Sequence, residues 1–279
     1  MARFELKDRT VVITGASGGI GGAMAAAFAR RGARLVLSGR DPEALAKAAD
    51  RVKSLGAVAH LVPADVTCRE EMEALVGKAI ELTGGLEVMV LGAGYGLLGE
   101  IADVTLEMWH HQMDVNFWGV LHGFYAALPH FLKQGHGRFI IINSLSGRMA
   151  MGLSAPYSAS KFALWGFADC VRTELREKNI GLLSVYPYFV TTSFQANIQS
   201  PDFKVPPDLA RKMFGQSPEK LGEKIVRACE RGRSEILCTA LGVIGTRVVP
   251  ISFYLSEGFR RLLLPLTRKV LGAKANQSK

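Results

Sequence analysis

Thr10-Val-Val-Ile-Thr14 leads directly into Gly15-Ala-Ser-Gly-Gly-Ile-Gly21, and this stretch decides the fold. The β-branched run predicts a buried strand, and the Ala-rich residues 19–31 predict a helix after the glycines. Strand, glycine turn and helix in this order are typical of a dinucleotide-binding loop. The glycines let the backbone approach a pyrophosphate, and the helix N-terminus offers free N–H groups to it.

The same alternation of strand and helix continues along the chain. Further strands are predicted at residues 34–38, 59–63, 86–91, 137–143, 180–187 and 235–238. Helices are predicted near residues 42–55, 69–83, 154–175 and 217–231. Repeated βα units predict an α/β fold with a single Rossmann-type, doubly wound parallel sheet flanked by helices, plus a C-terminal helical extension. We expect one catalytic domain over residues 1–240 and the extension over 241–279.

The net charge of +9 is unevenly distributed. Residues 241–279 hold seven Lys or Arg and one Glu, a net +6, which leaves +3 for the first 240 residues. A nearly balanced body without a nucleic-acid-binding motif predicts no nucleic acid partner. The four scattered cysteines show no metal-ligand spacing, so no metal is expected. The N-terminus shows no apolar signal segment, which predicts a cytoplasmic protein.

A second motif, Tyr157-Ser-Ala-Ser-Lys161, lies within a predicted helix. Residues four apart share one helix face, so the phenol and the ammonium are expected to be neighbours. An ammonium beside a phenol stabilises the phenolate and lowers its pKa, which suits proton exchange with an alcohol or ketone. Taken alone, the pair also fits an ordinary surface Tyr and Lys.

Together these motifs resemble the short-chain dehydrogenase/reductase family of the TGxxxGxG and YxxxK type. Between the two motifs, Asp65-Val66, Asn116 and Ser144 match in order, with Ser144 13 residues before Tyr157. The resemblance runs from about Leu6 to Phe194 and implies the catalytic set Asn116, Ser144, Tyr157 and Lys161. By that resemblance Tyr157 exchanges the proton and Ser144 hydrogen-bonds the substrate oxygen. Lys161 lowers the tyrosine pKa and holds the nicotinamide ribose, while Asn116 holds a water of a proton relay.

The resemblance also implies a set of cofactor contacts. They are Thr14, Gly15, Ser17, Gly18, Gly19, Ile20, Gly21, Ser38, Arg40, Asp65, Val66, Ala93, Gly94, Tyr157, Lys161, Pro187, Val190 and Thr192. The family's usual Asn-Ala-Gly is Gly92-Ala-Gly94 here, which puts local support of the sheet in question.

The end of the second strand indicates which cofactor binds. It reads Ser38-Gly39-Arg40, about where an NAD-binding fold places an acid for the ribose 2′-hydroxyl. A guanidinium pairs with a 2′-phosphate that an acid would repel. We therefore expect NADP(H), with Ser38 as a second phosphate ligand. A solvated Arg40 is the alternative.

The loops expected to surround the substrate are mostly apolar. The candidate residues are Tyr95, Met149, Met151, Leu153, Tyr188 and Phe194, with a lid over about 193–215. They predict interconversion of a hydrophobic ketone or aldehyde and its alcohol, of lipid, steroid-like or aromatic type. The alternatives are a soluble 3-oxoacyl-type reductase and a non-catalytic NADP-binding scaffold. The sequence names neither the substrate nor the preferred direction.

The C-terminal extension mixes apolar and basic residues. Pro250, Gly258 and Pro265 interrupt it, and no apolar run reaches the ~18 residues that a membrane span needs. Such a segment fits a peripheral membrane contact through 241–271. It equally fits a subunit interface in a homo-oligomer, because family members commonly form dimers and tetramers. Both interpretations remain open at this point.

Overall fold

Seven short apolar segments pair into one sheet in which every neighbouring pair is parallel. The computed structural model describes residues 4–192, 194, 198–202 and 215–238. The strands are β1 (Thr10–Thr14), β2 (Arg34–Ser38), β3 (Ala59–Leu61), β4 (Val88–Leu91), β5 (Gly137–Ile142), β6 (Ile180–Tyr186) and β7 (Glu235–Leu237). Their order across the sheet is β3-β2-β1-β4-β5-β6-β7. The predicted doubly wound parallel sheet is confirmed.

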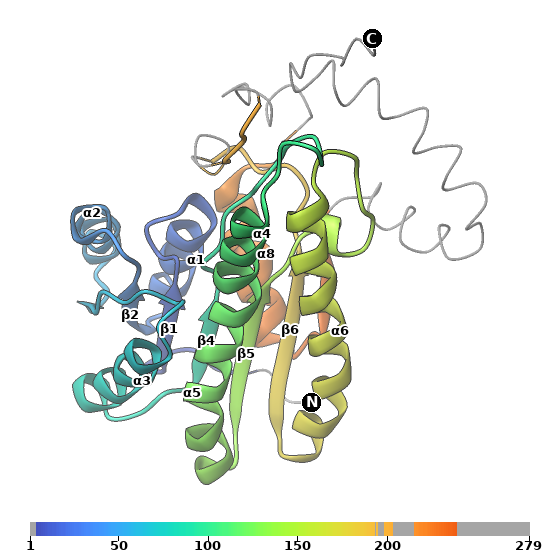
Figure 1. Cartoon of the computed structure of the whole chain (residues 1–279). Helices are drawn as coiled ribbons and strands as arrows, with labels where there is room; N and C mark the ends of the chain where they lie inside the picture. The colour runs from blue at the N-terminus through green and yellow to red at the C-terminus, as the bar shows by residue number, and fades with distance from the viewer. Residues whose placement is uncertain (1–3, 193, 195–197, 203–214, 239–279) are drawn as a thin grey trace, which may run out of the picture.

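Helices cover both faces of this sheet (Figure 1). They are α1 (Gly19–Ala29), α2 (Pro42–Lys53), α3 (Arg69–Thr83), α4 (Leu106–Met113), α5 (Gly119–Gln134), α6 (Ala155–Glu177) and α8 (Pro218–Glu230). A π-helical turn, η1 (Asp114–Trp118), joins α4 to α5, and a 3₁₀ turn, η2 (Leu145–Gly147), follows β5.

Alternation along the strands divides the core into two clusters. In β1, Val11 and Ile13 pack with α1, α2 and α8, whereas Val12 between them packs on the opposite face with α3, α5 and α6. Successive strand residues point to opposite faces, so each strand contributes to both clusters. This burial on both faces explains why the strands are almost entirely apolar.

The binding edge of the sheet follows from the strand order. β1 lies between β2 and β4, so the connections that follow β1 and β3 lead to opposite halves of the sheet. Ligands of such sheets bind at the carboxyl ends of the strands beside this switch point.

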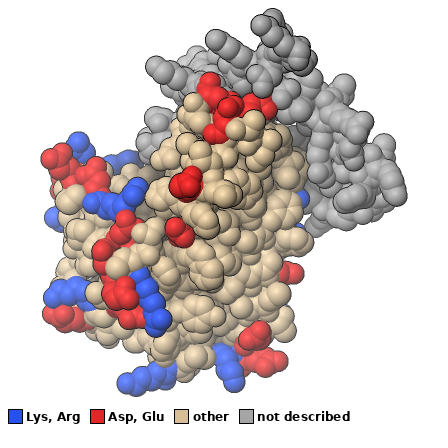
Figure 2. All heavy atoms as spheres, in the orientation of Figure 1, with Lys and Arg blue, Asp and Glu red and all other residues tan. Residues whose placement is uncertain are grey.

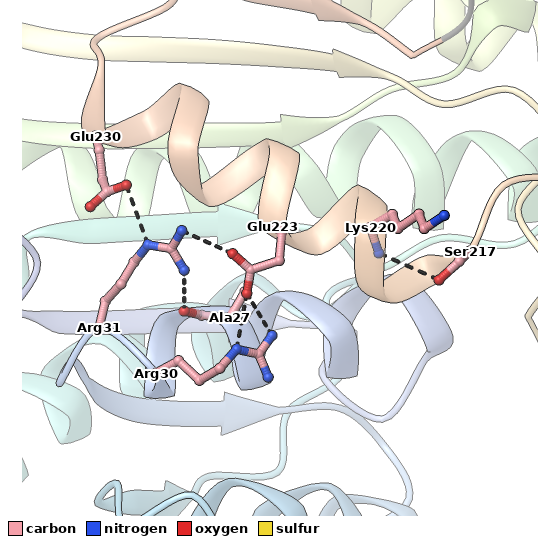
Figure 3. A network of polar contacts seen from close by, with 7 residues as sticks. All are labelled: Ala27, Arg30, Arg31, Ser217, Lys220, Glu223 and Glu230. Carbon is pink, nitrogen blue, oxygen red and sulfur yellow. Dashed lines mark hydrogen bonds and ion pairs between the residues drawn. The ribbon is translucent and has the colours of Figure 1, made fainter.

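Ion pairs join α8 to α1, the helix that follows the glycine loop (Figure 3). Glu223 of α8 accepts from Arg30 at 2.9 Å and from Arg31 at 2.9 Å, and Glu230 pairs with Arg31 at 3.3 Å. A Cβ on Gly222 would lie 2.7 Å from the Ala23 carbonyl oxygen, so the two helix backbones are in close contact. This packing fixes α1 relative to α8.

The elements with predicted bounds agree with the observed ones to within a few residues at their ends, but no bounds were predicted for α4 and α5. The π-helical turn at Asp114–Trp118 was not predicted. Most of the predicted lid and the whole predicted extension lie outside the described residues, as does the domain boundary near 240. In the part of the chain that the structure describes, no helix is both long and apolar enough to cross a membrane.

Candidate active site

Three loops meet where β1, β4 and β6 end. Gly15 has φ +69°, a conformation that favours glycine, and a Cβ there would lie 2.9 Å from Ala93 of the loop after β4. A Cβ on Gly19 would lie 2.3 Å from Thr192 Cγ2, in the segment after β6. The structure therefore brings the predicted glycine loop, Ala93 and Thr192 together.

The start of α1 suits a phosphate group. Its N-cap residue, Gly18, provides no side-chain cap, and no acid occurs in the first turn. Ser17 and Gly18 are exposed, so the start of this helix, whose first N–H groups have no partner within the helix, is accessible. A neutral, uncapped helix N-terminus beside a glycine turn fits the pyrophosphate of a dinucleotide.

Thr14 supports the switch point from β1. Its hydroxyl donates to the Val90 carbonyl at 3.2 Å and accepts from the backbone N–H groups of Gly92 at 3.1 Å and Ala93 at 3.4 Å. A Cβ at position 92 would lie 2.9 Å from the Thr14 carbonyl oxygen. Thr14 thus provides hydrogen bonds to a loop in which Gly92 has no side chain.

Ser144 lies in a tight turn at the end of β5. Its N–H donates to Asn143 Oδ1 at 2.8 Å, and its hydroxyl accepts from the Ser146 N–H at 3.1 Å. The next residue, Leu145, donates its N–H to the Pro187 carbonyl at 2.9 Å, which joins this turn to the loop after β6. Asn143 is a positioning residue that the sequence analysis missed, although it directly precedes Ser144.

Tyr157 and Lys161 lie in the first two turns of α6, as predicted. The Tyr157 hydroxyl hydrogen-bonds Ser144, while Lys161 Nζ donates to the Ile142 carbonyl at 3.1 Å and lies 5.8 Å from the Tyr157 ring centroid. Lys161 is only 5% exposed, and burial lowers its pKa to about 8.

The expected lowering of the Tyr157 pKa is not observed. Burial raises this pKa, and the hydrogen bond with Ser144 offsets the rise only in part. The Lys161 ammonium is directed at a backbone carbonyl, so the desolvation of the phenol dominates. Tyr157 is therefore protonated at neutral pH.

Asn116 lies in the π-helical turn and holds the loop after β4. Its Oδ1 accepts from the Tyr95 N–H at 3.0 Å, and its Nδ2 donates to the Tyr95 carbonyl at 3.0 Å and to Ser160 Oγ at 3.3 Å. A Cβ on Gly94 would lie 3.0 Å from Asn116 Oδ1 and 3.7 Å from Lys161 Nζ. Asn116 is thus beside Lys161, and the water relay stays a prediction.

The predicted adenine and phosphate contacts lie at the ends of β2 and β3. Burial alone would raise the pKa of Asp65, but hydrogen bonds from Thr67 and the charge of Arg40 lower it below its usual value. Arg40 is exposed at the sheet edge. Ser38 is 1% exposed, and its hydroxyl has no hydrogen-bond partner among the described residues. The Ser38 side chain is thus buried at the end of β2, and its binding of a phosphate stays a prediction.

The predicted substrate residues are placed differently from one another. The Phe194 ring centroid lies 6.4 Å from that of Tyr157, and the ring packs near Gly96, so Phe194 borders Tyr157. The Tyr95 hydroxyl is buried without a partner among the described residues, and burial raises its pKa to about 12. Leu153 is buried, and its carbonyl accepts from the Gly99 N–H at 2.8 Å.

The remaining predicted substrate and cofactor residues lie around the same carboxyl edge of the sheet. Met149, Met151 and Tyr188 are half-buried. The Val190 segment pairs with Gln216.

Comparisons with known proteins agree with this geometry. A profile of the short chain dehydrogenase family matches residues 9–202. The uncharacterized oxidoreductase YxnA of Bacillus subtilis is 31% identical over 270 residues, which cover 96% of this chain and 73% of that protein. The uncharacterized oxidoreductase SSP0419 of Staphylococcus saprophyticus is 38% identical over 67% of this chain and 81% of its own.

Two solved structures share the fold. A short chain dehydrogenase/reductase from Burkholderia phymatum, in complex with NAD, has a TM-score of 0.81 at 24% identity, over 90% of this chain and 96% of that one. An alcohol dehydrogenase from Thermococcus sibiricus, complexed with 5-hydroxy-NADP, has a TM-score of 0.71 at 26% identity, over 82% and 95%. The chain belongs to the short-chain dehydrogenase family of oxidoreductases.

Proposed function

We propose that this oxidoreductase interconverts a hydrophobic ketone or aldehyde and its alcohol with NADP(H). The observation that carries the proposal is the Tyr157–Ser144 hydrogen bond beside the buried Lys161. In reduction, Tyr157 gives its phenolic proton to the carbonyl oxygen, which Ser144 stabilises by a hydrogen bond. The bound nicotinamide supplies the hydride to the carbonyl carbon, or accepts it in the reverse direction.

The electrostatics of the pair favour reduction. The raised pKa of Tyr157 keeps the phenol protonated, as a proton donor must be. When the proton leaves, the Lys161 ammonium is the nearby charge that can stabilise the phenolate. Its pKa of about 8 keeps most of it charged at neutral pH.

The choice of NADP(H) rests on Arg40. Gly39 lies beside the glycine loop, since a Cβ there would be 3.5 Å from Ser17 Oγ. The adjacent Arg40 is therefore near the phosphate-binding turn, and its charge suits a 2′-phosphate. The position before it holds glycine where an NAD-specific site would place an acid.

The acidic charge around the loop after β4 helps to distinguish between the candidate substrate classes. Asp103 and Glu107 are exposed there and Glu100 is half-buried, with its N–H donating to Asp202 at 3.3 Å. Figure 2 shows acidic side chains gathered above α4. No Lys or Arg occurs from residue 79 to 132. A 3-oxoacyl-type reductase needs a basic surface for its acyl carrier, so this rim favours a neutral hydrophobic substrate.

A homo-oligomer is the partner that we propose, formed through α5. Trp118, Tyr125 and Leu132 are seven residues apart and 49%, 60% and 48% exposed, so they form one stripe along the helix. Residues 115–132 carry no Asp, Glu, Lys or Arg. The front face in Figure 2 is correspondingly poor in charge. A Tyr125→Glu variant should shift the sedimentation profile toward monomer, whereas a monomeric wild-type protein would refute this contact.

The test of function is NADPH oxidation against neutral ketones of increasing size and apolarity. NADH and a 3-oxoacyl thioester serve as comparisons, and each reaction is run with and without anionic liposomes. Rates that rise with apolarity and favour NADPH support the proposal. A preference for the thioester supports the 3-oxoacyl alternative, and NADPH binding without any turnover supports the scaffold. A rate increase with liposomes supports a peripheral membrane contact through 241–271.

A further inference from the structure

We propose that Arg148 is a positioning residue that locks the Ser144 turn against α6, β6 and β7. The inference rests on the proposed function of Ser144, Tyr157 and Lys161. Arg148 follows the 3₁₀ turn Leu145–Gly147, and its N–H donates to the Leu145 carbonyl at 2.9 Å. Its position is therefore linked to Ser144 by a single tight turn.

The Arg148 guanidinium contacts three other elements. It forms an ion pair with Glu235 of β7 and donates to the Tyr186 hydroxyl of β6 at 3.5 Å. Its Cζ lies 4.8 Å from the Trp165 ring centroid on α6 and 4.7 Å from that of Tyr186. A planar cation suits such a site, because it can lie over aromatic rings while its N–H groups bind a carboxylate.

Two of these contacts, with Trp165 and Tyr186, lie close to residues of the proposed site. Trp165 is one helical turn beyond Lys161 and two beyond Tyr157 on α6. Tyr186 directly precedes Pro187, whose carbonyl accepts from the Leu145 N–H at 2.9 Å. Arg148 thus fixes the turn that bears Ser144 relative to the helix that bears Tyr157, and the Ser144–Tyr157 hydrogen bond depends on that relation.

The environment of Arg148 makes its loss costly. Its side chain is 20% exposed and that of Glu235 is 30% exposed. Removal of the guanidinium would leave a half-buried carboxylate and two aromatic rings without their cation, so the turn would be free to shift. A displacement of about 1 Å at a catalytic group can lower the rate by about 100-fold.

Arg172 provides a matched control. Its side chain is also 20% exposed and pairs with Asp169 at 2.5 Å. It too joins α6 to β6, through a 3.0 Å hydrogen bond to Ser184. These contacts of Arg172, with Asp169 and Ser184, do not involve the Ser144 turn. If a half-buried arginine between α6 and β6 has only a structural role, Arg148→Met and Arg172→Met should have the same effect on kcat.

The experiment compares Arg148→Met, Arg148→Lys, Glu235→Gln and Arg172→Met. For Arg148→Met we expect kcat to fall by about tenfold or more, while the NADPH Kd and the ketone KM stay within about threefold. The kcat values of Arg148→Lys and Glu235→Gln should lie between those of Arg148→Met and the wild type, since each variant keeps part of the Arg148–Glu235 contact. Arg172→Met should keep kcat within about twofold, whatever its melting temperature.

A second readout does not require turnover. Amide hydrogen exchange over residues 144–149 should be faster in Arg148→Met and Glu235→Gln than in Arg172→Met or the wild type. Equal kcat in Arg148→Met and the wild type, or unchanged exchange in this turn, would overturn the proposal. If the wild-type protein reduces no ketone, the proposed function fails, and the exchange data alone decide the role of Arg148.

Discussion

The two halves of the sheet edge build their parts of the site by different means. Around β1 and β4, close backbone packing shapes the site. Gly15, Gly21 and Gly92 each lie where a Cβ would come within 3.0 Å of backbone atoms. Around β5 and β6, side-chain contacts shape the site. Asn143 accepts a hydrogen bond from the Ser144 N–H, and Arg148 joins the Ser144 turn to α6 and β7. Gly147 is equally crowded there, but its neighbours include the Asn143 side chain.

This difference separates binding from chemistry. The first half offers neutral N–H groups and space, so changes there should act on cofactor affinity. The second half encloses the charges of Lys161, Arg148 and Glu235, so changes there should act on kcat and on pH dependence. The predictions below test this separation, from the largest expected effect to the smallest.

A methyl group added to the glycine cradle should have the largest effect. In Gly21→Ala the new Cβ would lie 2.1 Å from the Gly15 carbonyl oxygen, and backbone must move to accommodate it. We expect NADPH affinity, measured by fluorescence titration, to fall by about 100-fold or more, because the phosphate-binding turn is displaced. Gly77→Ala is the control, since nothing lies within 4 Å of its Cβ position on α3. Equal binding by both variants would contradict the backbone account.

Replacement of the buried ammonium should change how stability depends on pH. Burial lowers the Lys161 pKa from 10.5 to about 8, so between these values the unfolded chain binds the proton and the folded one does not. Wild-type stability therefore gains up to about 1.4 kcal/mol per pH unit in this window, and below about pH 8 the folded state bears the whole penalty.

The measurement is chemical denaturation of Lys161→Met and wild type at several pH values. The stability of the variant relative to the wild type should decrease by about 3 kcal/mol from pH 7 to 10.5, from the shift of 10.5 to about 8. A constant difference over this range would show that Lys161 titrates normally in the folded protein.

Removal of the Thr14 hydroxyl should change the free energy of unfolding by less than the Lys161 substitution does. Thr14→Val loses one donated and two accepted hydrogen bonds at the switch point. We expect a loss of about 2 kcal/mol in the free energy of unfolding, since buried backbone groups lose their partner. Thr14→Ser keeps the hydroxyl and should recover most of that loss. If valine and serine are equivalent, Thr14 does not support the loop at Gly92.

Loss of the Arg40 charge should have the smallest effect, because Arg40 is exposed. We expect Arg40→Ala to weaken NADPH binding by about tenfold and to leave NADH binding unchanged, because only NADPH carries the 2′-phosphate. Arg51→Ala removes an equal charge from α2 and serves as control. Preference of the wild-type protein for NADH would show that Arg40 is a solvated surface charge.

The sequence was sufficient for the fold and the family, whereas the roles of the predicted site residues stay predictions. Apolar strands between helices predicted the parallel sheet, and the fixed spacings of Gly15, Gly19 and Gly21 and of Tyr157 and Lys161 were informative because local geometry links residues so close together.

The sequence did not predict contacts between residues distant in the chain, nor properties that depend on burial. Arg148 and Glu235 are 87 residues apart, so no local pattern predicts their contact. Neither the burial of Ser38 nor the raised pKa of Tyr157 has a signal in the sequence, because both depend on how the loops pack around them.

The most direct test of the central claim is Tyr157→Phe, assayed for NADPH binding and for ketone reduction in parallel. The change removes one hydroxyl and keeps the ring beside Phe194. We predict an NADPH Kd within about threefold of the wild-type value and a kcat reduced by about 10²- to 10⁴-fold, the usual contribution of a general acid. A variant that reduces ketones at the wild-type rate would contradict the assignment of Tyr157 as the proton donor, and with it the proposed mechanism.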